Sequence, residues 1–589
     1  MAEPTASSVS NDCAVAAVRL SCLCKNFGSL SALADLDVQI GAGELFGFVG
    51  PDGAGKTTLL RILAGVKHST SGEARIFDED PRQARLRVGY LTQHFSLYSE
   101  LSIDENLKYY AGVRNVSRAN FEQRREALLQ RVGLSEFRNR IAGHLSGGMR
   151  QKLALCCVLM SDPDLLLLDE PTTGLDPLSR GEVWQLIREL VTDGKTVVIA
   201  TPHFDEGQRC SRVALMQGGR ILAAGPPSEL IKQLGSTRLE IRCDKLQAAT
   251  RLLLKAQERP DIAFNEMNVY GDRVDLISVD PAVVQSDVQT MLSQAGMSSY
   301  TVSFAEPTLE NVFIASLRAR GFVEPECPPF PFAGASAQIA GEIAIEARQL
   351  GKRFGHFTAV DKVSIDIRHG EIFGLLGANG AGKTTTIQML TGLIKPTTGE
   401  ILVGEQCGKL GTSEFRRRLG YMSQKFTLYD DLTVAENLAF YAAAYSLDAS
   451  LRQQRVEWVL SMCELSKLQH TVVGSLPWGL KQRIAFGASV LHQPSLLFLD
   501  EPTAGLDPVA RRQLWRIIRD FAAHGCAVVV TTHFLDDAEY CHRLGLMIEG
   551  QLAAQGAPGE IKTAAGHQFS ASLEEAFISI VLQTRTVPV

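Results

Sequence analysis

The stretch Gly50-Pro51-Asp52-Gly53-Ala54-Gly55-Lys56-Thr57-Thr58 follows an apolar run, Leu45 to Val49, and opens a segment with helical spacing. A second stretch, Gly377-Ala378-Asn379-Gly380-Ala381-Gly382-Lys383-Thr384-Thr385, follows Ile372 to Leu376 in the same way. Both fit G-x-x-x-x-G-K-[ST] between a strand and a helix, the context in which this pattern is specific. The glycines let backbone N–H groups surround phosphates at a helix N-terminus, the lysine neutralises the outer phosphates, and the first threonine hydroxyl reaches Mg²⁺. The sequence therefore predicts two sites for nucleotide phosphates.

The two phosphate loops belong to a long internal repeat. Lys383 follows Lys56 by 327 residues, and Asp500 follows Asp169 by 331. A period of this size indicates a duplicated domain, because stacked structural repeats have periods of about 20–50 residues. In each copy apolar runs alternate with helical segments, which predicts an α/β fold with a parallel sheet and a site at the carboxyl ends of its strands.

The 589 residues are too many for one hydrophobic core. We expect a first nucleotide-binding domain over 18-234 and a second over 343-563. Residues 236-320 have no counterpart of similar length in the second half, and their predicted order is typical of a ferredoxin-like α+β module. That order is strand 238–243, helix 246–257, strands 262–270 and 272–279, helix 281–295 and strand 298–305. A proline-rich linker at 322-341 and a C-terminal tail helix within 564-589 complete the prediction.

Composition narrows the possible classes. The densest apolar run, Leu153 to Met160, is shorter than the roughly 20 residues of a spanning helix, and residues 1–18 lack the pattern of a signal peptide, so we expect a cytoplasmic protein. The net charge of -6, without a basic run, argues against nucleic acid as a partner. The 12 cysteines lack paired C-x-x-C spacing, which argues against zinc or an iron–sulfur cluster.

An apolar strand ends in an Asp-Glu pair in each copy, at Asp169-Glu170 and at Asp500-Glu501. The Asp at a buried strand end can hold the Mg²⁺ shell, and the adjacent Glu can orient or deprotonate the attacking water. The next apolar strand leads to a histidine at the same edge of the sheet. These histidines are His203 and His533, and Gln93 and Gln424 occupy matching positions as candidates to bind metal and water.

Another anion site is predicted at Leu145-Ser146-Gly147-Gly148-Met149-Arg150-Gln151. Ser146 is suited to cap a helix, and the two glycines after it expose N–H groups at the start of that helix. The phosphate loop of the same copy cannot fill this site, so it requires a nucleotide held by a partner.

Taken in order, and twice, these motifs resemble the ATP-binding cassette (ABC) superfamily. The subtype is similar to ATPase subunits of ABC-2 type exporters, on the residues Gly174-Leu175-Asp176-Pro177, Gly505-Leu506-Asp507-Pro508, Asn106-Leu107, Asn437-Leu438 and Pro307-Thr308-Leu309-Glu310-Asn311-Val312-Phe313. The resemblance covers nearly the whole chain. It implies ATP and Mg²⁺ as cofactors, closure of the two cassettes head to tail on two ATP molecules, and ABC-2 type permease subunits as partners. It also implies a place on the cytoplasmic face of the inner membrane, permease contacts within 94–144 and 425–475, and export of a drug or other small molecule.

The resemblance further implies two unequal sites. The set Lys383, Glu501 and His533 would face a complete signature at Leu145 to Gly148. The set Lys56, Glu170 and His203 would face Leu476-Pro477-Trp478-Gly479, where the family has Leu-Ser-Gly-Gly. Pro477 supplies neither hydroxyl nor N–H, and Trp478 is bulky where a glycine lets backbone approach phosphate. We expect the Lys56 site to bind ATP and turn over slowly; the alternative is that Gly479 and the helix dipole suffice.

Other functions also occur on tandem cassettes. A soluble translation factor acting on ribosomes usually has a charged helical linker and two complete signatures. A sugar-importer ATPase is the third reading, although residues 236–320 and the terminal Leu-Glu-x-x-Phe segments favour the exporter. A DNA-repair cassette protein would require zinc-type cysteine spacing.

Overall fold

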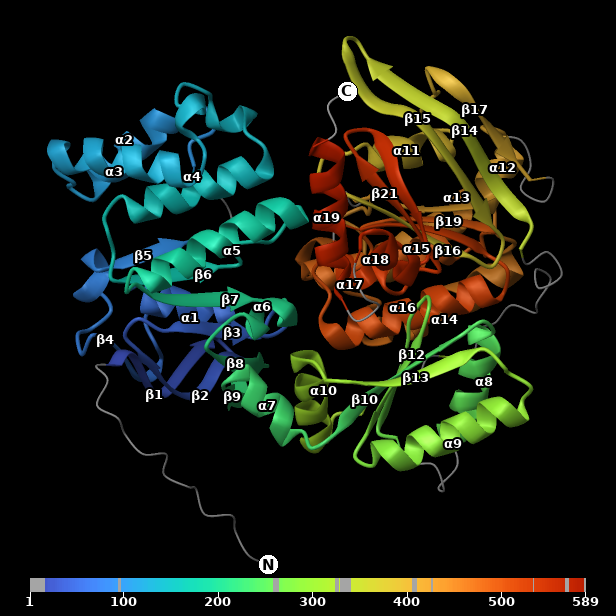
Figure 1. The fold of residues 1–589 in the computed structure, drawn as a ribbon, viewed down its shortest axis with the longest axis horizontal. Helices are drawn as coiled ribbons and strands as arrows, with labels where there is room; N and C mark the ends of the chain where they lie inside the picture. Colours follow the sequence, from blue (N-terminus) through green and yellow to red (C-terminus); the bar gives the residue numbers. More distant parts are fainter. Residues whose placement is uncertain are drawn as a thin grey trace, which may run out of the picture. The chain divides into compact units, whose positions relative to one another are not determined.

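The computed structural model describes residues 16–93, 97–257, 264–323, 328, 341–404, 410–424, 427–532, 534–566 and 571–586. They form two compact units, shown in Figure 1. The first ends at Ile231; the second begins at Lys232 and also takes in Gly174–Leu178. All but residues 322, 323, 328 and 341 of the predicted linker lie outside the described residues, as does His533.

The first unit is built on a six-stranded sheet in the order β5-β6-β7-β3-β8-β9, parallel except for β9. A three-stranded antiparallel sheet, β2-β1-β4, lies in the same unit. The elements are β1 (Ala16–Phe27), β2 (Leu30–Gly41), β3 (Leu45–Val49), α1 (Lys56–Leu63), β4 (Ser71–Ile76), β5 (Val88–Leu91), α2 (Ile103–Val113), α3 (Arg118–Arg131), α4 (Gly147–Leu159), β6 (Leu165–Asp169), α5 (Pro177–Thr192), β7 (Thr196–Thr201), α6 (Phe204–Gln208), β8 (Arg212–Gln217), β9 (Arg220–Gly225) and α7 (Pro227–Gln233).

The second unit repeats this architecture with the sheets β18-β19-β20-β16-β21-β22 and β15-β14-β17. The elements are β14 (Ile343–Phe354), β15 (Phe357–Arg368), β16 (Ile372–Gly377), α11 (Lys383–Leu390), β17 (Thr398–Val403), α12 (Ser413–Arg418), β18 (Leu419–Met422), α13 (Val434–Ala444), α14 (Ala449–Met462), α15 (Trp478–Val490), β19 (Leu496–Asp500), α16 (Pro508–Ala523), β20 (Ala527–Thr532), α17 (Leu535–Ala538), β21 (Arg543–Ile548), β22 (Gln551–Gly556), α18 (Pro558–Ala564) and α19 (Leu573–Thr586). The parallel strands confirm the predicted α/β class.

Residues between the two cassettes form a four-stranded antiparallel sheet, β11-β12-β10-β13, that belongs to the second unit. Two helices, α8 and α9, pack on it through an apolar core that includes Leu239, Leu253 and Val288. The elements are β10 (Thr237–Cys243), α8 (Leu246–Gln257), β11 (Glu266–Val269), β12 (Val274–Ser278), α9 (Pro281–Gln294), β13 (Tyr300–Ala305) and α10 (Leu309–Ala319). We call residues 236–320 the intercalated module; its ferredoxin-like class and the five domain boundaries stay predictions.

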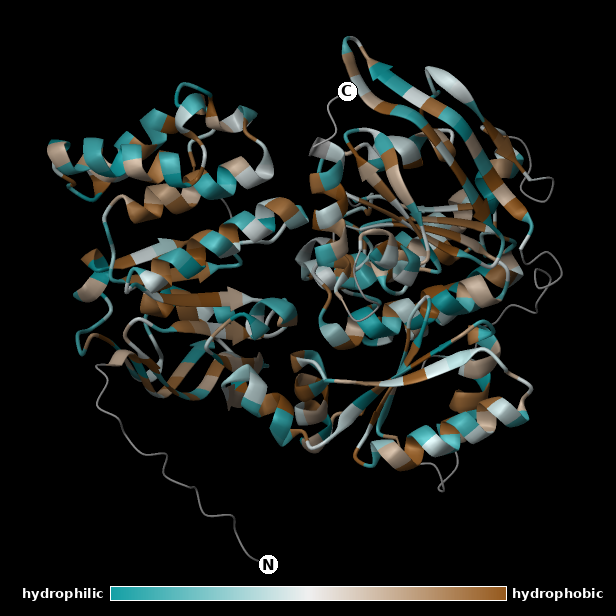
Figure 2. Cartoon of the chain, viewed as in Figure 1, coloured by the Kyte–Doolittle hydropathy of each residue, from teal (hydrophilic) through white to brown (hydrophobic). Residues whose placement is uncertain are grey.

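The central strands of each cassette are apolar along their whole length because both faces of a parallel sheet are covered. β6 and β19 are buried at every residue, and Figure 2 shows the hydrophobic colouring of such strands. This burial fixes the strands, so that the polar residues at their carboxyl ends are held at defined positions.

Candidate functional site

Each phosphate loop connects a central strand to a helix, β3 to α1 and β16 to α11. Gly55 and Gly382 adopt φ of 101° and 100°, a left-handed conformation that a side chain disfavours. A Cβ on Gly55 would also lie 2.6 Å from the carbonyl oxygen of Ala32. Glycine is therefore required immediately before each lysine, both by backbone conformation and by space.

The two lysines make equivalent contacts inside their loops. The Nζ of Lys56 donates to the carbonyl oxygens of Gly50 at 2.7 Å and Pro51 at 2.9 Å. The Nζ of Lys383 donates to those of Gly377 at 2.7 Å and Ala378 at 3.0 Å. Burial lowers the pKa of both lysines. A buried ammonium held only by neutral carbonyls gains strongly from a phosphate, because charge-assisted hydrogen bonds are about twice as strong as neutral ones.

The residues predicted to hold Mg²⁺ meet in both copies. The Thr57 hydroxyl donates to Asp169 Oδ1 at 3.0 Å, and the Thr384 hydroxyl donates to Asp500 Oδ2 at 3.4 Å. Burial raises the pKa of both aspartates. Hydroxyl and carboxylate oxygens side by side beneath a phosphate loop fit the all-oxygen shell that Mg²⁺ prefers, and a divalent cation would offset the burial of the carboxylates.

The glutamates that follow these aspartates have a strained backbone. Glu170 and Glu501 adopt φ of 53° and 54°, and the N–H of each donates to the neighbouring strand, to Ala200 O at 2.8 Å and to Thr531 O at 3.0 Å. A left-handed non-glycine residue costs roughly 1–3 kcal/mol and is typical of functional sites. The same strain in both copies aims both carboxylates from the sheet edge.

The surroundings of the two glutamates differ. The Thr173 hydroxyl donates to Glu170 Oε2 at 3.0 Å, whereas the Gln424 amide donates to Glu501 Oε2 at 3.0 Å. Gln93, the counterpart of Gln424, is exposed. Burial raises the pKa of Glu170, and the Asp52 carboxylate, where the second loop has Asn379, raises it further.

His203 lies at the N-terminus of α6, and its backbone N–H donates to the Thr201 hydroxyl at 3.1 Å. Glu206, three residues later, is fully buried and accepts from the hydroxyls of Thr172 and Thr201 and from Arg180 Nε. This places the histidine at the carboxyl end of β7, where the parallel-sheet argument predicts it. His533 lies outside the described residues.

Sequence reasoning missed the buried acid beside each histidine. In the second copy Asp537 is 1% exposed and accepts from the Thr503 hydroxyl and from Trp515 Nε1 at 3.0 Å. Asp537 follows Glu206 by 331 residues, the offset that relates Asp169 to Asp500. That shared offset is the signal that would have identified both acids.

The signature segments differ as their sequences require. The Ser146 hydroxyl accepts from Met149 N at 3.2 Å and caps α4, so the N–H groups at the start of that helix are ordered. α15 begins at Trp478 with Pro477 at the cap position and no side-chain cap bond, and Trp478 is half exposed. Helix caps of the serine type are worth about 0.5–2 kcal/mol. Only the first signature therefore presents a serine hydroxyl followed by two glycines, Gly147 and Gly148.

Between the glutamine and the signature of each copy, a buried asparagine holds a loop that carries an exposed tyrosine. Asn106 donates to the carbonyl oxygens of Tyr98, Leu101 and Ser102 at 2.9–3.2 Å, and its Oδ1 accepts from Tyr98 N at 2.9 Å. Asn437 makes the equivalent set around Tyr429. The Asn-Leu pairs therefore have a structural reason: the amide satisfies a loop that helix hydrogen bonds cannot reach.

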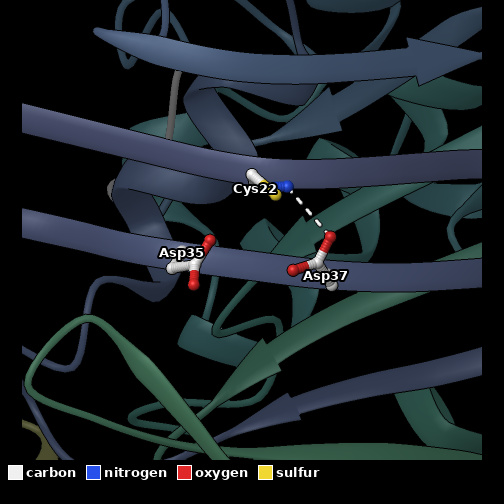
Figure 3. Close-up of side chains that lie close together, drawn as sticks. All are labelled: Cys22, Asp35 and Asp37. Atoms are coloured by element: carbon white, nitrogen blue, oxygen red, sulfur yellow. Dashed lines mark hydrogen bonds between the residues drawn. The ribbon is translucent and has the colours of Figure 1, made fainter.

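An exposed group of Cys22, Asp35 and Asp37 lies on the antiparallel sheet of the first unit, as Figure 3 shows. The backbone N–H of Cys22 donates to Asp37 Oδ1 at 2.9 Å. The two carboxylates raise the pKa of the Cys22 thiol, which disfavours the thiolate that binds metals. We assign no site to this group.

The fold and these sites define a class of protein: two P-loop nucleotide-binding domains of the ABC type joined in one chain. The profile of the ABC transporter family matches residues 33–173 and 360–504. The probable multidrug ABC transporter ATP-binding protein YbhF of Escherichia coli strain K12 is 39% identical over 574 residues, which are 96% of this chain and 98% of that protein. The chain therefore belongs to the family of ABC transporter ATP-binding proteins, is of the tandem YbhF type, and is an ATPase.

Other relatives match one half or the fold alone. The daunorubicin resistance ATP-binding protein DrrA3 of Streptomyces coeruleorubidus is 34% identical over 300 residues, covering 49% of this chain and 92% of that protein. A solved complex of an archaeal ribosome recycling factor, aABCE1, with the stalk protein aP1 matches with a TM-score of 0.59 and 20% identity over 92% of each chain, a likeness of fold only. Within the described residues, no helix combines the length and apolar character needed to cross a membrane.

Proposed function

We propose that this chain is the ATP-hydrolysing subunit of an ABC-2 type exporter of drugs or other small molecules, acting on separate permease subunits from the cytoplasmic face of the inner membrane. The observation that carries the proposal is the duplicated site, with Lys56, Asp169 and Glu170 in one copy and their counterparts in the other. The names of the relatives support the transporter context and drug substrates.

Hydrolysis follows from the placement of these side chains. The loop N–H groups and the lysine hold the outer phosphates, and the glutamate at the strand end accepts hydrogen bonds or a proton from the attacking water. Thr57 with Asp169, and Thr384 with Asp500, would hold Mg²⁺, which neutralises the phosphate charge. His203 would contact the terminal phosphate from β7, and the signature of the opposite cassette would complete each site once the cassettes close.

Two pairs of exposed aromatic rings support contact with a partner. Tyr98 packs edge-on against Tyr109 at a centroid distance of 4.6 Å, and Tyr429 against Phe440 at 4.8 Å. All four side chains are 44–47% exposed, although aromatic pairs normally bury their apolar area. Their presence in both copies, each fixed by a buried asparagine, fits two equivalent permease contacts.

The partner proposal is tested by affinity capture of the tagged chain from detergent-solubilised cells without added ATP. Recovery of one or two polytopic membrane proteins is the expected result. Recovery of ribosomal subunits would overturn the exporter proposal and favour the translation factor. Recovery of an importer permease with a periplasmic binding protein would favour the sugar importer.

The aromatic contact has its own test. Tyr98→Ala combined with Tyr429→Ala should reduce export and permease capture while leaving nucleotide binding unchanged. Phe304→Ala removes an equally exposed ring, 53% exposed, from the intercalated module and is the control. Undiminished export by the double tyrosine variant would exclude these rings as the contact.

A further inference from the structure

The intercalated module and the second cassette share a buried charged interface within the second unit. The Arg273 guanidinium bonds Glu539 Oε2 at 2.5 Å and Asp275 Oδ1 at 3.1 Å. Arg512 on α16 bonds Glu310 Oε1 at 2.7 Å and also reaches Glu266 on β11. These pairs fix α16 against the module, so that space between them has a defined shape.

A cavity of about 530 Å³ lies in this interface. It is bounded by one face of α8, one face of α16 and the strand β11 with the turn after it. Its α16 positions, 512, 516, 519, 520 and 523, are spaced three or four residues apart around a single helix face. Cavities that bind small molecules are typically about 300–1,000 Å³, so the size fits a small organic ligand.

The charge of the lining is strongly positive. Five arginines line the cavity, from α8 (Arg251), α10 (Arg318) and α16 (Arg512, Arg516 and Arg519), against two carboxylates, Glu266 and Asp520. Glu266 is already engaged by Arg512 and Arg318. Three positive charges therefore remain in excess at the lining, which favours a ligand with negative charge.

Arg519 is the arginine least compensated by the protein. Its Nε is buried and has no hydrogen-bond partner in the part of the chain that the structure describes. Burial, aided by the neighbouring charge of Arg516, lowers the pKa of Arg519 to about 10. A buried unpaired guanidinium nitrogen is costly, and an anion at this point would remove that penalty.

The remaining lining is apolar and aromatic. Tyr270 and Tyr540 lie with ring centroids 4.7 Å apart, and Leu246, Met267 and Val269 contribute aliphatic surface. Burial raises the pKa of Tyr540 to about 12, so its hydroxyl remains a neutral donor. Such a surface suits the body of an organic ligand better than a free inorganic ion.

We propose that this cavity is a binding site for a small amphipathic anion, a carboxylate or phosphate on an aliphatic or aromatic body, with the anionic head at Arg519 and Arg516. The ligand would lie between the module and the second cassette and stabilise their contact. The site is separate from the phosphate loops, and its occupancy does not depend on which permease the chain serves.

The test uses the fluorescent sulfonate 8-anilinonaphthalene-1-sulfonate (ANS) with the purified full-length chain, the nucleotide sites being filled by ATP in buffer with EDTA. The chain should bind ANS saturably, and Arg519→Gln should weaken binding about tenfold or more, as expected for loss of one charge-assisted hydrogen bond. Arg417→Gln removes an exposed arginine elsewhere in the second cassette and should have no effect. The neutral analogue N-phenyl-1-naphthylamine should bind equally to both variants.

Two further readings complete the test. Arg519→Gln should not lower the unfolding temperature of the free protein, because it removes a poorly compensated charge, so that weakened ANS binding cannot be attributed to misfolding. Displacement of ANS by octanoate but not by octyl phosphate assigns a carboxylate head, and the reverse assigns a phosphate. Equal ANS affinity of Arg519→Gln and Arg417→Gln, or displacement by neither anion, would overturn the proposal.

Discussion

The proposed inequality of the two ATP sites can be tested by removing one catalytic glutamate at a time. In the closed arrangement that we propose, the Glu501 site receives the signature capped by Ser146, and the Glu170 site receives Pro477 and Trp478. Glu170→Gln therefore silences the site with the defective signature, and Glu501→Gln silences the site with the complete one. The two substitutions are chemically identical, so each serves as the control for the other.

The magnitude follows from the donor that Pro477 cannot supply. Loss of one preorganised donor to a developing charge raises the barrier by about 2.7–4 kcal/mol, which slows the step roughly 100- to 1,000-fold. Glu501→Gln should then leave about 1% or less of the ATPase rate, whereas Glu170→Gln should leave most of it. The Asp52 carboxylate, which raises the pKa of Glu170, acts in the same direction.

The assay is steady-state phosphate release by the purified chain, with ATP binding measured separately to show that both sites are occupied. A restoring variant sharpens it: Pro477→Ser with Trp478→Gly in the Glu501→Gln background should recover a large part of the lost rate. Equal losses in the two single glutamate variants, or no recovery in the restored one, would refute the reasoning. In that case Gly479 and the dipole of α15 suffice without the serine.

Three other substitutions test the structure itself, each by denaturant unfolding of the full chain. Arg273→Met should destabilise the second unit by about 3–5 kcal/mol because it leaves buried carboxylates unpaired; Arg348→Met, at an exposed pair, should cost about 1 kcal/mol or less. The pKa of His492 is lowered by burial to about 4, so stability should fall by up to about 3 kcal/mol between pH 6.5 and 4, where the unfolded chain binds the extra proton; His492→Gln should abolish that slope. Asn437→Ala should cost about 1–3 kcal/mol and accelerate amide exchange around Tyr429; unchanged exchange would argue against its structural role.

The phosphate loops and the Asp-Glu pairs could be predicted because their chemistry is written in contiguous residues. Gly55 must precede Lys56 whatever the rest of the chain does, since its backbone conformation and its neighbours exclude a side chain. The burial of β6 and β19 follows from four consecutive apolar residues before the acid in each. In such segments local sequence alone sets the geometry.

The buried acids and the cavity could not be predicted in this way. Glu206 is stabilised by Thr172 and Arg180, and nothing near residue 206 in the sequence indicates those partners. The cavity depends on α8 and α16, which are separated by some 260 residues. Contacts at such separations arise from tertiary packing, to which helix and strand periodicity are blind.

The duplication nevertheless provides an internal reference for these features. α5 is the counterpart of α16 at an offset of 331 residues, and both have a buried tryptophan, Trp184 and Trp515, on the core side. On the opposite face Arg512 and Arg516 correspond to Gly181 and Gln185, so only α16 has the arginines that bind the module and line the cavity. Pro477 departs from Ser146 in the same register. Residues that match across the copies are those that phosphate chemistry and the core require, and the two proposals made from this chain, unequal ATP sites and an anion cavity, both rest on positions where the copies differ.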